Sequence, residues 1–141
     1  MLRHERRIAA GRATVWEIVS RLDEWDELLP TIDDVTRLGP AGPIAVGTRF
    51  AVRQPGLVPA EYTVTDWRPD EGFTWESTKL GLHTVATHTL HTDGQGTVLR
   101  LGIGWSGPMA WLVRLLVGRK GRSYLEQEAA AFAEHAERAS R

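Results

Sequence analysis

Hydrophobic positions along the chain follow a helical period near both ends and an alternating period between them. Near the N-terminus, one helical face is formed by Val15, Trp16, Val19 and Leu22. Thr14 and Glu17 have the spacing of a capping box, which predicts that this helix begins at Thr14. A second short helix is expected over "DEWDELL", because Pro30 would end it. The segment "RHERRIAA" before both helices is typical of a strand.

From Val35 to Trp105, β-branched and aromatic residues alternate with polar ones, and turn sequences such as "QPG", "RPDEG" and "TDGQG" interrupt them. This pattern predicts at least five antiparallel strands. From Met109 the period is helical again, with a stripe made of Leu125, Ala129, Phe132, Ala136 and Ala139. The apolar face of a sheet must be covered, and only this last helix is long enough. We therefore expect a sheet that curls around a C-terminal helix over about residues 109–139.

Composition narrows the class of protein. The 141 residues, 42% hydrophobic and 25% charged, predict a single globular domain over residues 1–141. A net charge of -1 gives no broad field for phosphate backbones or anionic lipid, so no nucleic-acid partner is expected. The lack of cysteine excludes disulfides and Cys-ligated zinc. The most apolar run, "MAWLVRLLV", is too short to span a membrane, and we expect a cytoplasmic monomer or homodimer.

The stretch "GLHTVATHTLH" over residues 81–91 holds three histidines. In a strand, His88 shares a face with Leu90, whereas His83 and His91 point the other way. The three imidazoles therefore do not converge, and we expect no metal ion and no cofactor. His88 should point inward, either as a core histidine bonded to a hydroxyl or as a functional group.

The same alternation assigns aromatic side chains with polar tips to the inner face of the sheet. The inward residues are Phe50, Val52, Tyr62, Val64, Phe73, Trp75, Ser77, Leu99, Leu101, Ile103 and Trp105. Inward Tyr, Trp, Ser and His side chains each need a polar partner. Their mixture suits a ligand cavity with a few oriented donors, and it also suits a core whose polar tips pair with one another.

Two segments each allow two interpretations. Extending the stripe of the last helix backward from Leu125 reaches Arg122, Gly118, Leu115 and Trp111. Either "GRKGR" breaks the helix, or Gly118 leaves room for a ligand and Arg122 meets an anionic or carbonyl group at a cavity mouth. The segment "QPGLVP" is either a turn or an apolar flap whose Leu57 and Val58 touch the ligand, and its exposed apolar residues favour the flap.

The ordered segments "TVWEIVSRLDEW", "VGTRFAVRQPG", "YTVTDWRPDEGFTWES", "HTLHTDGQGTVLRL" and "YLEQEAAAFAEHAE" resemble the START-like, or SRPBCC, helix-grip superfamily and its polyketide cyclase/dehydrase-like branch. The resemblance implies an α+β fold, in which a seven-stranded antiparallel sheet wraps around a long C-terminal helix, with two short helices after the first strand. It also implies a hydrophobic cavity between sheet and helix. It supplies no fixed catalytic motif, because members of the superfamily differ widely in function.

Two functions are compatible with these residues. One is a polyketide cyclase/dehydrase-like enzyme, with His88 as general acid/base and with Tyr62 and Ser77 as donors to an enolate oxygen. The alternative is a non-catalytic carrier or sensor of a lipid-like or aromatic molecule. Either way the expected partner is a small hydrophobic or aromatic molecule. The residues expected to bind it are Trp16, Phe50, Leu57, Trp75, Leu101, Trp105, Leu115, Gly118 and Arg122.

Overall fold

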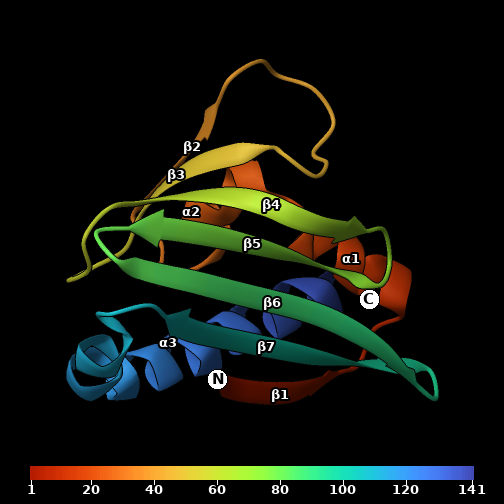
Figure 1. Cartoon of the computed structure of the whole chain (residues 1–141). Coiled ribbons are helices and arrows are strands. Elements are labelled where there is room, and N and C mark those ends of the chain that lie inside the picture. Colours follow the sequence, from red (N-terminus) through yellow and green to blue (C-terminus); the bar gives the residue numbers. More distant parts are fainter.

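A computed structural model describes residues 1–141 as one curled antiparallel sheet gripping a long C-terminal helix (Figure 1). The sheet has the strand order β1-β7-β6-β5-β4-β3-β2. The elements are β1 (Leu2–Ile8), α1 (Arg12–Val19), the short 3-10 helix η1 (Leu22–Glu24), α2 (Trp25–Leu28), β2 (Asp34–Leu38), β3 (Arg49–Arg53), β4 (Ala60–Arg68), β5 (Gly72–Lys79), β6 (Leu82–Asp93), β7 (Gly96–Ser106) and α3 (Ala110–Ala139). The predicted helix-grip α+β fold is confirmed.

The core lies between the concave face of the sheet and α3. Every strand residue that alternation assigns to the inner face is buried, except Ile103 and Trp105, which are half-buried. From α3 the core receives Leu125, Ala129, Phe132 and Ala136, whereas Ala139 is exposed. His88 points inward, and His91 is exposed on the outer face. The period-2 pattern of the strands and the period of the last helix therefore position both halves of the core correctly.

The predicted capping box at Thr14 is wrong. Helix α1 begins at Arg12 with Gly11 as its N-cap, and no side chain caps it. Glu17 accepts a hydrogen bond from Arg21 at 3.1 Å on the helix surface instead of turning back toward Thr14. The backbone that leads from β1 into α1 is held by tertiary contacts at Ala9 and Ala10.

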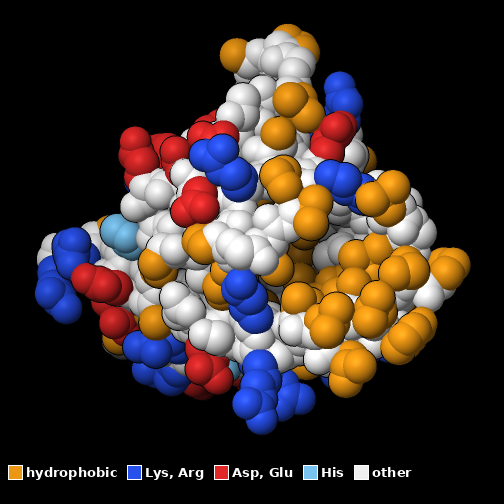
Figure 2. Space-filling view, turned by 90° about the vertical axis from the view of Figure 1, so that its left-hand side faces the viewer, with side chains coloured by type: hydrophobic (Ala, Val, Ile, Leu, Met, Phe, Trp, Pro, Cys, Tyr) orange, Lys and Arg blue, Asp and Glu red, His pale blue; other side chains and the backbone are white.

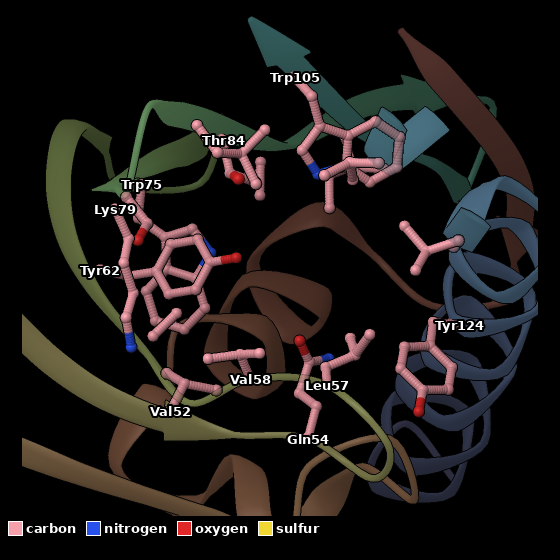
Figure 3. Close-up of a pocket in the computed structure, with 18 of the residues that line it drawn as sticks. Val52, Gln54, Leu57, Val58, Tyr62, Trp75, Lys79, Thr84, Trp105 and Tyr124 are labelled. Atoms are coloured by element: carbon pink, nitrogen blue, oxygen red, sulfur yellow. The ribbon is translucent and has the colours of Figure 1, made fainter. Parts of the chain in front are cut away.

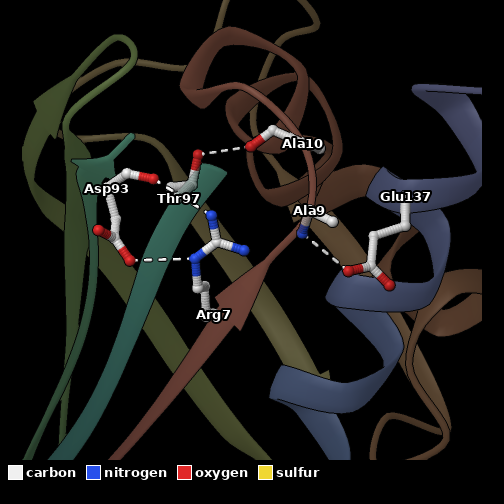
Figure 4. A network of polar contacts seen from close by, with 6 residues as sticks. All are labelled: Arg7, Ala9, Ala10, Asp93, Thr97 and Glu137. Atoms are coloured by element: carbon white, nitrogen blue, oxygen red, sulfur yellow. Dashed lines mark hydrogen bonds and ion pairs between the residues drawn. The ribbon is translucent and has the colours of Figure 1, made fainter. Parts of the chain in front are cut away.

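Those contacts form a polar network at one end of the sheet (Figure 4). The Thr97 hydroxyl donates to the carbonyl of Ala10 at 2.8 Å, and the backbone N–H of Ala9 donates to Glu137 of α3, also at 2.8 Å. Beside them, Arg7 pairs with Asp93 at 3.0 Å. The network ties β1, β7 and the last turns of α3 together. It holds together the end of the fold at which β6 turns into β7. The β3–β4 and β5–β6 loops lie at the opposite end (Figure 1).

The possible helix break near Gly118 does not occur, because α3 is continuous from Ala110 to Ala139. A Cβ at Gly121 would lie 3.3 Å from the Trp105 ring, so this glycine allows close packing, whereas nothing lies within 4 Å of a Cβ at Gly118. The first turns of α3 project past the end of β7 (Figure 1). There the extrapolated core positions Trp111 and Leu115 are 66% and 74% exposed.

Candidate ligand-binding site

A cavity of about 460 Å³ lies between the inner face of β3–β7, α3 and the β3–β4 loop (Figure 3). Eighteen of the 28 residues that line it are hydrophobic. Figure 3 shows Tyr62, Trp75 and Trp105 of the sheet, Leu57 and Val58 of the loop and Tyr124 of the helix around the same space. Both the volume and the apolar lining with a few polar groups are typical of small-molecule sites.

The structure brings six of the twelve predicted site residues to this cavity. They are Leu57, Tyr62, Trp75, Ser77, His88 and Trp105. Trp16, Phe50 and Leu101 do not line the cavity and are buried in the core. The expectation that these three contact the ligand is therefore corrected. Trp16 packs edge-on against Trp67, with their ring centroids 5.0 Å apart.

The remaining three predicted residues, Leu115, Gly118 and Arg122, border a separate hollow beside Met1 and Trp105. The prediction placed them on the cavity because their stripe continues the core stripe of the helix. In the first half of α3, however, that stripe passes beside β7 and the start of β1. The cavity is faced instead by a neighbouring helical stripe made of Val113, Val117, Lys120, Tyr124 and Glu128.

Glu128 is a buried polar residue of the cavity that was not predicted from the sequence. It is only 9% exposed, and its Oε1 accepts a hydrogen bond from the Thr31 hydroxyl at 3.0 Å. Burial raises the pKa of Glu128 to about 7, and the Thr31 hydrogen bond opposes this shift. Its Oε2 has no hydrogen-bond partner in the protein. Every fully enclosed side-chain oxygen of the structure has a partner, so Oε2 is not fully enclosed. Glu128 therefore presents a free oxygen to the cavity and is poised between acid and carboxylate near neutral pH.

Tyr62 provides a second polar group beside Glu128. Its ring stacks on Trp75, with centroids 4.8 Å apart, and its hydroxyl points into the cavity (Figure 3). Burial, and then the nearby Glu128 carboxyl, raise the pKa of Tyr62 to about 12. The phenol therefore stays protonated at neutral pH. It is a hydrogen-bond donor aimed at whatever fills the cavity.

The environment of His88 does not support the predicted acid/base role. The imidazole stacks on Phe73 at 4.2 Å, and its Nδ1 lies 3.4 Å from the Phe73 carbonyl oxygen. Burial lowers the pKa of His88 to about 3, so the ring is neutral at neutral pH. Because a carbonyl only accepts, Nδ1 carries the hydrogen and Nε2 is left as an acceptor. His88 is thus suited to receive a hydrogen bond rather than to exchange a proton near neutrality.

The β3–β4 loop, residues 54–59, lies over the entrance and is held at both ends. The Tyr124 hydroxyl of α3 donates to the Pro55 carbonyl, and Lys79 of β5 donates to the Pro59 carbonyl at 2.8 Å. Between these anchors Leu57 is half-buried over the cavity and Val58 is exposed. This placement favours the flap interpretation of "QPGLVP" over that of a simple turn.

A metal site and a membrane-spanning helix are not supported by the structure. No group of three or more His, Asp or Glu side chains is arranged to hold a metal ion. His83, which faces outward from β6, pairs with Glu76 at 2.7 Å instead of approaching His88. No helix is both long and apolar enough to cross a bilayer.

The fold and cavity together define a helix-grip protein of the SRPBCC superfamily with an internal apolar site. The chain belongs to the family described as polyketide cyclase/dehydrase and lipid transport, whose sequence model matches residues 2–137. No curated protein sequence matches it significantly. The family assignment and the cavity support a role in binding a hydrophobic small molecule.

Three solved structures have the same fold although they are distant in sequence. The Zhui aromatase/cyclase of a Streptomyces species has a TM-score of 0.72 at 14% identity, over 99% of this chain and 94% of that one. Norcoclaurine synthase from Thalictrum flavum, in complex with dopamine and hydroxybenzaldehyde, has a TM-score of 0.72 at 17% identity, over 94% and 83% of the two chains. A Thermus thermophilus protein has a TM-score of 0.73 at 19% identity, over 99% of both chains.

Proposed function

We propose that this protein binds a small aromatic or polyketide-like molecule that carries at least one oxygen. The observation that supports this most is a set of unpartnered polar atoms on a mostly apolar cavity wall. The Tyr62 hydroxyl and protonated Glu128 are donors, and Nε2 of His88 is an acceptor. A carbonyl or phenol on a flat apolar skeleton would satisfy them, while indole rings pack against its faces. The aromatic ligands of norcoclaurine synthase and the aromatase/cyclase activity named for Zhui agree with this class of ligand.

Ligand binding should change the intrinsic fluorescence, because Trp25, Trp75 and Trp105 all line the cavity. We expect hydroxylated naphthalenes and anthraquinones to bind more tightly than the parent hydrocarbons. Tyr62→Phe should weaken binding of the hydroxylated compounds by about 1 to 3 kcal/mol, the cost of leaving a buried polar group unpaired. Its effect on the hydrocarbons should be small, which makes them the internal control. Failure of a broad aromatic and acyl panel to alter the fluorescence would contradict the proposal.

A second candidate function, proton-transfer catalysis on the bound molecule, is favoured by one observation. Glu128 is a buried carboxyl at the cavity wall whose pKa is raised to about 7. As a carboxylate it is able to remove a proton from a carbon flanked by carbonyls, and as an acid it is able to protonate a departing hydroxyl. Cyclisation followed by dehydration needs both steps. We therefore transfer the acid/base role proposed for His88 to Glu128, and Tyr62 remains the donor to the enolate oxygen.

The pH dependence of turnover separates an enzyme from a carrier. If Glu128 transfers the proton, the rate on a poly-β-carbonyl substrate should follow a titration near pH 7, the raised pKa of Glu128. Glu128→Gln should abolish the reaction at every pH and still bind the substrate in the fluorescence assay. Binding without turnover in the wild type would identify a carrier or sensor. Unaltered turnover in Glu128→Gln would exclude Glu128 from catalysis.

A further inference from the structure

Exposed apolar side chains are concentrated at the end of the fold where the cavity opens: Val58, Leu80 and Met109 line the cavity, whereas Trp111, Leu115 and Leu116 lie beside it on the first turns of α3. We call this region, made of segments 54–60, 77–83 and 106–125, the mouth surface. It contains six of the eight large hydrophobic residues that the structure leaves exposed: Val58, Leu80, Met109, Trp111, Leu115 and Leu116. Figure 2 shows hydrophobic side chains gathered around a hollow on this end of the molecule, with Lys and Arg side chains beside them. Patches of this kind mark interaction sites in soluble proteins.

The mouth surface is basic as well as apolar. Its three segments contain five basic residues and no Asp or Glu. The basic residues are Lys79, Arg114, Arg119, Lys120 and Arg122. Because the whole chain has a net charge of -1, the mouth surface carries +5 and the remainder carries -6. The near-zero total thus conceals an uneven distribution of charge, in which the three segments are basic and carboxylates such as Glu61, Glu76 and Glu126 lie only at their borders.

We propose that the mouth surface docks onto the anionic face of a phospholipid membrane. Trp111, Leu115 and Leu116 would enter the boundary between headgroups and acyl chains, while the arginines of the same helix contact the lipid phosphates. The helix lies on the bilayer and does not cross it, since no helix is apolar enough to span it. The cavity opens within the docked surface, so an apolar molecule would pass between bilayer and cavity without crossing water.

The charge argues against a second copy of the chain as the occupant of this surface. In a symmetric dimer the same patch faces itself, so five basic residues would meet five others with no carboxylate among them. An anionic bilayer supplies the complementary charge instead. Part of the mouth surface is separate from the ligand site proposed above, because Leu116, Arg119 and Arg122 do not line the cavity.

Sedimentation with large vesicles tests the proposal on the full chain. We expect binding to vesicles of phosphatidylcholine and phosphatidylglycerol in equal parts, little binding to phosphatidylcholine alone, and weaker binding as salt is raised. Arg119→Gln with Arg122→Gln should reduce the partition coefficient by about tenfold or more. Leu115→Ser with Leu116→Ser should reduce it by a similar factor, since each exposed leucine loses its insertion. All four positions are exposed, so folding should be unchanged.

Matched controls lie away from the mouth surface. Val46→Ser removes an apolar residue that is 64% exposed, and Arg6→Gln with Arg12→Gln removes two exposed charges. These variants should bind vesicles as the wild type does. Vesicles should also shift the emission of Trp111 to the blue, and Trp111→Phe should lose that shift.

Three results would overturn the proposal. They are absence of vesicle binding at low ionic strength, equal binding to neutral and anionic vesicles, and an equal loss of vesicle binding in the control variants. A concentration-dependent dimer that Leu115→Ser abolishes, without vesicle binding, would assign the surface to a second copy of the chain.

Discussion

Glu128→Gln should become increasingly more stable than the wild type as the pH rises from about 4.5 to about 7, the interval between the ordinary and the raised pKa of Glu128. Over this interval the unfolded chain releases the proton of Glu128, whereas the folded chain keeps it. The wild type therefore loses stability with rising pH, by up to about 3 kcal/mol for a shift of this size. Below the interval both states hold the proton, and Glu128 adds no pH dependence. Glutamine is neutral throughout and removes the effect.

Urea unfolding at a series of pH values measures this difference directly. Glu126→Gln is the matched control, because Glu126 is exposed two residues earlier on the same helix. It controls for the loss of one carboxylate from α3. Thr31→Val should steepen the loss of stability, because the Thr31 hydroxyl is the group that lowers the pKa of Glu128. A Glu128→Gln difference that does not grow with pH would show that the carboxyl is not held protonated.

His88 should change the pH dependence of folding stability in the opposite direction. Its pKa is lowered from 6.5 to about 3, so its contribution to stability is fully present above pH 6.5 and is lost as the pH falls toward 3. Between pH 4.5 and 6.5 the contributions of His88 and Glu128 oppose each other. The wild-type curve alone would then hide both groups. Only the difference between each single variant and the wild type reveals them.

The fold could be predicted from the sequence because the hydrophobic period changes from helical to alternating, and back, where the structure changes between helix and strand. Alternation places His88 and Trp75 inward without knowledge of neighbouring strands, since successive residues of a strand face opposite sides. The stripe from Leu125 to Ala136 likewise identifies the face of α3 that meets the core. Turn residues separate the strands. These are local rules, and they hold because the sheet buries one face almost everywhere.

The site was harder to predict because it depends on which elements meet. Leu115 and Arg122 continue the core stripe of α3, but in this half of the helix the stripe passes beside β7 and the start of β1 and does not face the inside of the sheet. Glu128 had a visible signal, a carboxylate three residues after Leu125 on the buried face. Its role in the cavity could not be predicted from this signal alone, because it depends on contacts with Thr31 and Tyr62, which lie far away in the sequence. Contacts of this range are set by the fold and not by local periodicity.

Trp25→Ala should produce the largest loss of stability among substitutions at the cavity wall. Trp25 is only 1% exposed, and its indole N–H donates to the Val19 carbonyl at 3.1 Å. Its ring centroid lies 5.0 Å from that of Trp75, 5.3 Å from His88 and 5.5 Å from Phe132. It therefore joins the short helices to the sheet and to α3. Removal of a buried tryptophan costs about 3 to 5 kcal/mol, and the Val19 carbonyl loses its partner as well.

Because Trp25 also lines the cavity, the space left by Trp25→Ala should be continuous with it. Added indole should then restore part of the lost stability by binding the folded state alone. The control is Trp111→Ala, a change of the same size at a side chain that is 66% exposed, which should cost no more than about 0.5 kcal/mol. Chemical denaturation of the three proteins, with and without indole, gives both quantities. A loss below about 1 kcal/mol in Trp25→Ala would mean that the wall of the cavity does not depend on this ring.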